Sequence, residues 1–120
     1  MGTGTRRIRF GKKGNPGLNL IPCANLYLSD ERMDVEAVFH RIRMGRLCPW
    51  LYLITLSEQE GELFAIYAAS ELSQPFYDGR DMYVCGIGRG YRRTLGLVEQ
   101  MLWQIYQDTD AFDVHRYFHP

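Results

Sequence analysis

The stretch DMYVCGIGRGYRRTLGLVEQMLWQIYQD, residues 81–108, decides the fold because it joins a strand to the longest helical pattern in the chain. Residues 81–87 predict a β-strand and residues 90–108 predict a helix. The glycine-rich sequence between them, residues 86–90, predicts a tight turn. At 100° per residue, one helical face collects a stripe that we expect to face the core: Tyr91, Leu95, Val98, Leu102, Ile105 and Tyr106.

The same turn is the strongest candidate for a binding site. Backbone N–H groups at the start of a helix, together with the helix dipole, favour anions. Cationic side chains at this end oppose the dipole, and a bound anion would offset that unfavourable interaction. The candidate anion-binding residues are Gly86, Gly88, Arg89, Gly90, Arg92 and Arg93. The alternative is that the glycines serve only a tight joint. A dinucleotide fingerprint would need glycine where Tyr91 stands, and the Gly-Lys-Ser/Thr end of a P-loop is missing.

Apolar side chains outside the expected core stripe predict a protein interface. Leu97 and Trp103 lie off that stripe on the long helix, and Phe76 and Tyr77 fall in a predicted loop at 70–80. Large exposed side chains of this kind mark interaction surfaces when they gather. We therefore expect a protein partner or a second copy of the chain, unless the C-terminal tail covers Trp103.

Length and charge exclude several classes of protein. The chain of 120 residues predicts one domain over 1–120, with mobile ends at 1–4 and 119–120. Fourteen basic residues balance fourteen acidic ones, which argues against general binding to nucleic acid or anionic membranes. The basic segment from Arg6 to Lys13 leaves contact with nucleic acid as an alternative. No apolar run approaches the ~20 residues of a membrane span.

The remaining elements complete an α+β pattern. Strands are expected at 5–10, 18–28, 50–56 and 62–69, with the second at a sheet edge or bulged because Pro22 cannot donate a hydrogen bond. A helix is expected at 33–44, capped by Ser29 or Asp30 and ended before Gly45. Residues 112–118 are expected to dock as a tail or a short strand. The order ββαβββα predicts a two-layer fold, in which two helices pack on one face of an antiparallel sheet of about five strands.

The sequence carries no recognisable chemistry. His40, His115 and His119 are scattered, and three cysteines without close spacing predict neither disulfides nor a metal site. Without a signal peptide, they fit a reducing cytosol. We therefore expect no catalytic residue and no cofactor. The sequence favours a small, soluble, non-catalytic binding or regulatory protein that acts through protein contacts. The alternatives are a binder of a phosphate-bearing ligand at Gly86–Arg93 and contact with nucleic acid through the basic segment.

Overall fold

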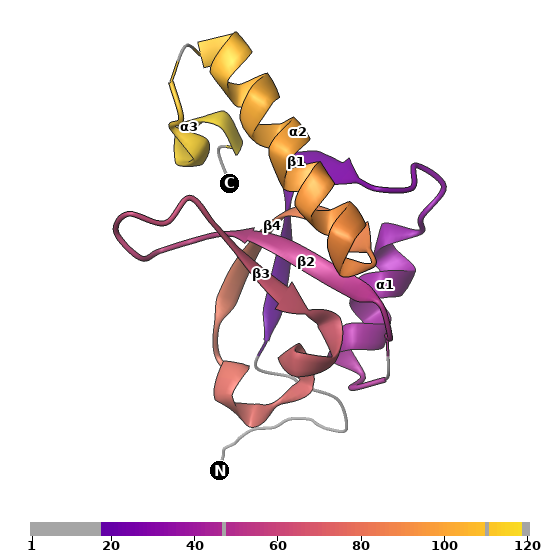
Figure 1. Cartoon of the computed structure of the whole chain (residues 1–120). Coiled ribbons are helices and arrows are strands. Elements are labelled where there is room, and N and C mark those ends of the chain that lie inside the picture. Colours follow the sequence, from indigo (N-terminus) through magenta and orange to yellow (C-terminus); the bar gives the residue numbers. More distant parts are fainter. Residues whose placement is uncertain (1–17, 47, 110, 119–120) are drawn as a thin grey trace.

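The computed structural model of the protein (Figure 1) describes residues 18–46, 48–109 and 111–118. The strand expected at 5–10, the basic segment at 6–13 and the two expected mobile ends lie outside these residues. The main elements, in chain order, are β1 (Asn19–Leu28), α1 (Val35–Arg43), β2 (Leu51–Leu56), β3 (Phe64–Ala68), β4 (Asp81–Arg89), α2 (Tyr91–Thr109) and α3 (Val114–Phe118). The predicted α+β class is confirmed.

The four strands within the described ranges form one sheet in the order β1-β4-β2-β3. β2 pairs antiparallel with both β3 and β4, whereas β1 and β4 are parallel. The expectation of a purely antiparallel sheet is therefore wrong. β1 and β2 run in opposite directions, and β4 enters the space between them; because β4 is antiparallel to β2, it must be parallel to β1.

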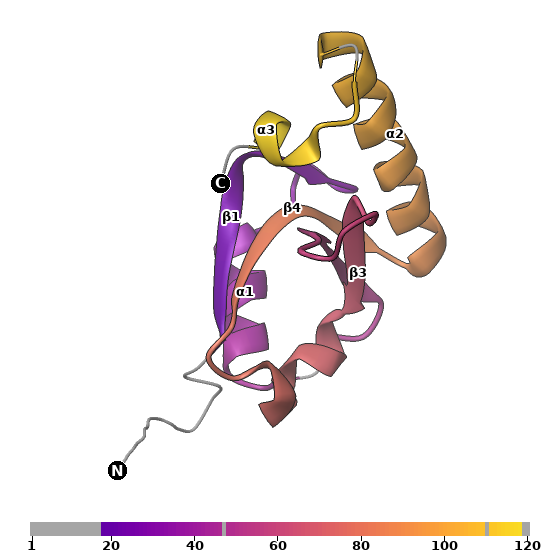
Figure 2. The same ribbon diagram turned by 90° about the vertical axis from the view of Figure 1, so that its left-hand side faces the viewer.

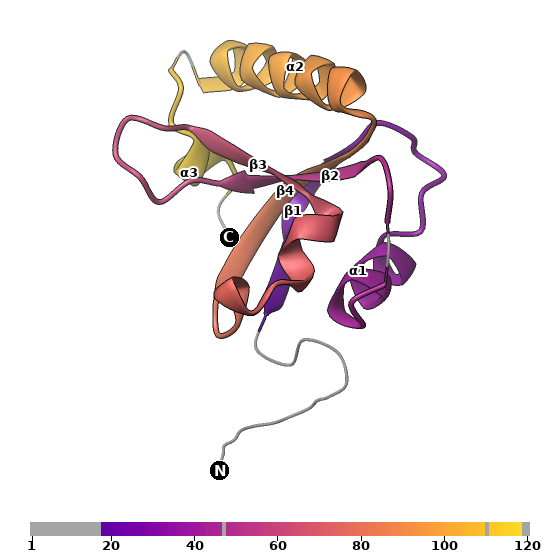
Figure 3. The same cartoon turned by 60° about the horizontal axis from the view of Figure 1, so that its bottom comes forward.

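The two long helices cover opposite faces of the sheet, as Figure 3 shows, so the expected two-layer arrangement is replaced by three layers. The reason lies in β2, where the neighbouring residues Leu53 and Ile54 are both fully buried. Adjacent residues of a strand point to opposite faces. Leu53 belongs to the core under α1 and Ile54 to the core under α2, and each face needs its own helix.

Helix α1 forms where its pattern predicts it. The expected stripe faces the core. Its buried members are Val38, Phe39 and Ile42, and Val35 is partly buried beside them. Asp34 caps the helix by accepting a hydrogen bond from the N–H of Ala37, so the predicted caps Ser29 and Asp30 are wrong by one turn. Gly45 follows the helix at φ +69°, in the left-handed region that glycine tolerates best.

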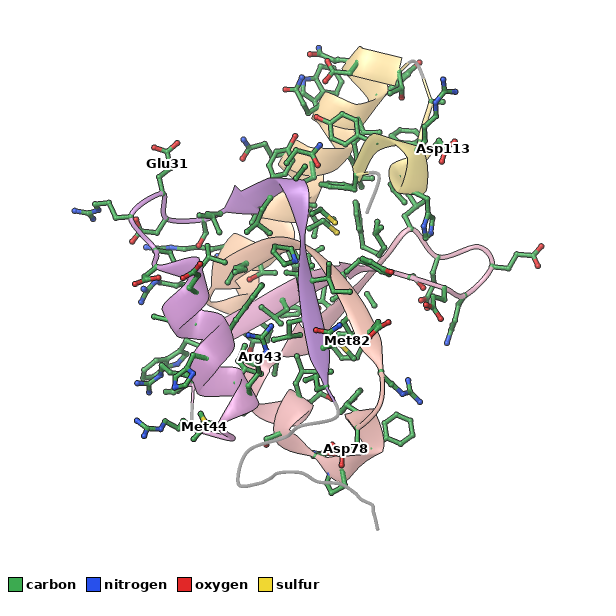
Figure 4. All side chains as sticks on the ribbon, turned by 180° about the vertical axis from the view of Figure 1, so that it is seen from behind. Glu31, Arg43, Met44, Asp78, Met82 and Asp113 are labelled. Atoms are coloured by element: carbon green, nitrogen blue, oxygen red, sulfur yellow. The ribbon has the colours of Figure 1, made fainter. Side chains whose placement is uncertain are left out.

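Strand β1 is an edge strand, as Pro22 predicts. Its register against β4 shifts between Pro22 and Tyr27, which marks an irregularity in the pairing. Figure 4 shows Arg43 reaching from α1 toward this strand, where its guanidinium donates to the carbonyl of Leu20 at 3.1 Å. The α1 layer is thereby joined to the sheet edge.

Two predicted irregular segments are helical. The expected loop at 70–80 contains two short 3-10 helices, Ala69–Ser73 and Pro75–Tyr77. The C-terminal tail forms α3, which packs between the end of α2 and β1 (Figure 2) and buries Val114 and Phe118. No helix in the described ranges is long and apolar enough to cross a membrane.

Candidate functional site

The glycine-rich segment is mostly strand. β4 continues to Arg89, and Gly86 and Gly88 lie buried inside it. Gly86 pairs with Ile54 on one side and with Tyr27 on the other. Only Gly90, at φ +81°, forms the joint to α2. The predicted five-residue turn is therefore a single-residue turn after a longer strand.

The two buried glycines let α2 approach β4 closely. A Cβ atom on Gly86 would lie 2.9 Å from Ile54 Cδ1 and 3.4 Å from Met101 Sδ. A Cβ atom on Gly88 would lie 2.9 Å from Thr94 Cβ and 3.0 Å from Thr94 Cα, inside ordinary van der Waals contact. At Gly88 the helix occupies the space of a side chain, whereas at Gly86 the nearest atom belongs to Ile54 of β2 and Met101 of α2 lies at an ordinary contact distance.

Some backbone groups that an anion would use are already occupied. The N–H of Arg89 donates to Ser29 Oγ at 3.0 Å, and the N–H of Gly90 donates to the Trp50 carbonyl at 2.6 Å. The Thr94 hydroxyl and N–H both donate to the Gly90 carbonyl. The structure brings Arg89, Arg92 and Arg93 to the same end of α2 with exposed side chains. The buried glycines lie away from that surface.

The core-facing side of α2 differs from the predicted stripe. The buried residues are Thr94, Leu97, Met101 and Ile105, so the predicted stripe is about a quarter-turn off and shares only Ile105. Thr94 packs over Gly88 and Met101 over Gly86. The apolar sector of α2 is wider than its contact with the sheet. The glycines of β4 select which edge of that sector turns inward.

Leu97 is consequently a core residue, 6% exposed, and its prediction as an interface residue is corrected. Tyr77 is also buried and stacks edge-to-face on Tyr67, so it too belongs to the core. Phe76 is exposed, with the Arg80 guanidinium 4.4 Å from its ring centroid. Of the four predicted interface residues, only Phe76 and Trp103 are on the surface.

The predicted core stripe of α2 instead forms an apolar surface, which we call the outer face of α2. Tyr91 is 54% exposed, Leu95 45% and Tyr106 42%. Val98 and Leu102 lie between them and are partly exposed. At the two ends of the face, Tyr91 meets Tyr52 with ring centroids 5.5 Å apart, and Tyr106 meets Phe112 at 5.2 Å.

Two tryptophans border this face. Trp103 is 65% exposed and lies at the margin of the outer face, two turns beyond Gly96. Trp50 is 77% exposed and adopts φ 67°, the only described non-glycine residue with a positive φ. The carbonyl of Trp50 accepts a hydrogen bond from the Gly90 N–H, so Trp50 lies beside the start of α2. Sequence reasoning assigned Trp50 to a strand, and no sequence pattern distinguishes it from the residues that follow.

The sheet edge farthest from β1 is formed by β3. Phe64 and Ile66 of β3 pack with the α2 core while staying partly exposed. β3 is the edge strand on this side, and its five residues, FAIYA, include no charge and no proline. Proteins usually guard such edges with charged residues, prolines or bulges.

A separate hollow of about 710 Å³ opens between the β2–β3 hairpin, the start of β4 and α3. Some of its polar groups are hydrogen-bonded to one another. His115 Nε2 lies 3.0 Å from the Ser57 carbonyl oxygen, and Ser57 Oγ donates to Glu62 Oε1 at 2.8 Å. Among the described residues, no three His, Cys, Asp or Glu side chains gather where a metal could bind.

The three cysteines are free and buried. Cys23 and Cys85 lie on the neighbouring strands β1 and β4, in the core under α2. Burial raises the pKa of both thiols above the ordinary value. A protonated thiol is a poor nucleophile, so we expect this pair to react slowly at neutral pH.

The chain was compared with protein-family models, with curated proteins and with solved structures. None of these three comparisons finds a match.

Proposed function

We propose that this is a small non-catalytic binding or regulatory protein that recognises another protein chain through the outer face of α2. The observation that carries the proposal is the row of three half-exposed side chains on one helix, Tyr91, Leu95 and Tyr106. Single exposed apolar residues are common on proteins and need no explanation. A row of large ones along a helix is what a helix or groove of a partner covers.

The composition of this surface supports the proposal. Binding energy concentrates in tryptophan, tyrosine and arginine side chains near the middle of interfaces. The outer face carries two tyrosines, and its margins carry two tryptophans and an exposed arginine: Trp50, Trp103 and Arg92. Aromatic rings supply large contact areas while having few rotatable bonds to immobilise.

The backbone of Trp50 adds a second line of support. A non-glycine residue in the left-handed region costs roughly 1–2 kcal/mol. Trp50 adopts this backbone conformation and yet stays 77% exposed. Burial of its side chain within the described residues therefore does not offset the energetic cost. Strain of this kind persists where the position of the side chain serves a contact.

Site-specific photo-crosslinking in the native cell tests the proposal. A benzoylphenylalanine at position 95 is expected to capture a protein at a defined mass. The matched control is position 100, where Gln100 is exposed on the opposite side of the same helix and should give no such adduct. Equal crosslinking at both positions, or none at either, would contradict the proposal.

A second candidate function is binding of a phosphate-bearing small ligand at the start of α2. Arg92 and Arg93 stand in the first helical turn, which contains no acidic residue. Free N–H groups and the dipole at this end attract anions. Thermal-shift titrations with nucleotides, coenzyme A and sulfate test it. Stabilisation that is lost in Arg92→Gln/Arg93→Gln is expected, and no shift with any anion refutes it.

We also propose that the protein works in the cytosol. Three free cysteines fit a reducing compartment. Fractionation of cells that express the tagged chain tests this, and recovery in a membrane or secreted fraction would contradict it.

A further inference from the structure

We propose that the partner is a second copy of this chain, bound through antiparallel packing of the two α2 helices on their outer faces. This inference rests on the proposed function and names its partner. It follows from the spacing of the apolar residues, from two exposed charges at the margin of the face, and from the area that the face leaves uncovered.

The spacing is that of a helix-pairing seam. The apolar positions of the outer face advance by four, three and four residues and comprise Tyr91, Leu95, Val98 and Leu102, all exposed or partly exposed. Steps of three and four residues keep one seam on the same side of the helix, where it can face a partner helix along its length. Such a seam is self-complementary, because a twofold axis brings the same residues of both copies together.

Two exposed charges select the antiparallel orientation. Arg92 and Glu99 are seven residues apart and lie at the same margin of the outer face. An antiparallel pair in which Leu95 lies beside Val98 of the second copy brings Arg92 near Glu99 of that copy, and this contact occurs twice. A parallel pair would instead place this margin of the two copies on opposite sides of the seam, so Arg92 would not meet Glu99 of the second copy.

Neither charge has an ionic partner within the described part of the chain, where the salt bridge found is that between Asp30 and Arg32. Arg92 also opposes the dipole of its own helix, and no acid in the first turn offsets it. A carboxylate from a second copy would offset both effects. This pairing accounts for one arginine of the cluster at the start of α2 without a small ligand.

The same register brings Tyr106 of one copy close to Trp50 of the other. With Leu95 beside Val98 of the second copy, Tyr106 projects past the seam toward the residues that precede α2 in that copy. Trp50 is exposed there, because its carbonyl accepts the Gly90 N–H. Each end of the paired helices then closes with an aromatic contact.

The uncovered area suits a small stable dimer. The residues Trp50, Tyr91 and Tyr106 are 77%, 54% and 42% exposed. With an area of 150–250 Å² for each ring and a contribution from Leu95, roughly 400 Å² of apolar surface stays open on each copy. An interface of about 1,200–1,600 Å² in total, somewhat over half of it apolar, needs about 350–450 Å² from each copy.

Sedimentation equilibrium of the full chain is the first test, with a concentration-dependent dimer as the expected result. Leu95→Ser is expected to weaken the dimer at least tenfold. It should leave the circular dichroism spectrum of the monomer unchanged, because Leu95 is half-exposed. Gln100→Ser on the opposite side is the matched control and should dimerise like the wild type. A dimer that is insensitive to Leu95→Ser uses another surface and overturns the inference.

Orientation has its own test. A mixture of Tyr91→Cys and Leu102→Cys chains is expected to form mixed disulfide dimers much faster than either variant links to itself. The native cysteines are buried and do not compete. Arg92→Glu and Glu99→Arg should each weaken association several-fold, and the double exchange should restore it. Faster linking of each variant to itself would show a parallel pair and refute the antiparallel arrangement.

The outcomes separate this inference from the proposed function. A chain that is monomeric at every concentration but crosslinks from position 95 to a different protein in cells refutes the second copy and retains the binding surface. A monomer that gives no adduct at position 95, even when residues 1–17 are removed, refutes both. If removal of residues 1–17 exposes the adduct, that segment covers the face in the intact chain, and the second copy is refuted.

Discussion

Gly88→Ala is expected to destabilise the protein by about 1–3 kcal/mol, the cost of forcing one carbon into a packed layer. The added Cβ would lie 2.9 Å from Thr94 Cβ and 3.0 Å from Thr94 Cα, whereas ordinary contacts are 3.4–4 Å. The obstructing atoms include the backbone of α2, so relief requires movement of the helix and not a rotamer change. Because α2 forms one whole layer, its movement disturbs the packing of Met101 and Ile105 as well.

Two other glycines provide matched controls. A Cβ on Gly86 would meet the Cδ1 atom of Ile54 at 2.9 Å, but this atom ends a flexible side chain, so Gly86→Ala should cost less than Gly88→Ala. Gly96 lies exposed within α2, and nothing lies within 4 Å of an added Cβ. Gly96→Ala should therefore stabilise the protein by about 0.5–1 kcal/mol through helix propensity.

Urea unfolding followed by far-ultraviolet circular dichroism measures all three variants against the wild type. The expected order of unfolding free energy is Gly96→Ala, wild type, Gly86→Ala and Gly88→Ala, from the highest to the lowest, with unchanged m-values. If Gly88→Ala falls within about 0.5 kcal/mol of the wild type, the range of ordinary surface substitutions, then α2 does not pack on β4 as closely as argued.

Three further results are expected. Met101→Ala should lower the free energy of unfolding in urea by about 2–5 kcal/mol because the side chain is fully buried, whereas Leu95→Ala should stay within about 0.5 kcal/mol of the wild type. Equal losses would indicate that Leu95 faces the core, as the sequence predicted. Burial and the hydrogen bond to Tyr117 raise the pKa of Tyr27 above its ordinary 10.0, so its contribution to stability is present below about pH 10 and is lost as pH rises further. The free energy of unfolding of Tyr27→Phe should therefore depend less on pH between 9 and 11 than that of the wild type. An unchanged dependence would contradict this expectation. Cys23 and Cys85 should react with iodoacetamide at pH 8 only after unfolding in urea. Mass spectrometry counts the alkylated cysteines, and rapid labelling of the native chain would show that the thiols are accessible.

Local patterns sufficed for much of the fold. The strands β2 and β4 and both long helices form within a few residues of their predicted bounds, since each depends on short-range spacing and on nearby turn residues. The irregularity at Pro22 follows from the missing N–H of proline, and the helix end at Gly45 follows from the tolerance of glycine for a positive φ. Both properties belong to the residue itself and do not depend on its neighbours. The short helices at Ala69–Ser73 and at α3 escaped prediction because they are too short to show a helical period.

The outer face of α2 could not be read from the sequence. Helical spacing identifies a broad apolar sector, but any edge of that sector could turn toward a sheet. The edge that does so is chosen by packing between two elements, with Thr94 of α2 over Gly88 of β4 and Met101 over Gly86. The same reasoning misassigned Leu97, whose burial depends on that rotation.

The sequence by itself therefore determined the α+β class, the positions of the main elements and the apolar character of α2. Only the tertiary structure decided that β1 and β4 are parallel, that helices cover both faces, and which side of α2 stays in solvent. The division has one physical cause. Propensity and periodicity act through neighbours along the chain, whereas strand direction and helix rotation are set by close packing between elements, where the absence of a single Cβ at Gly88 decides how a helix can lie.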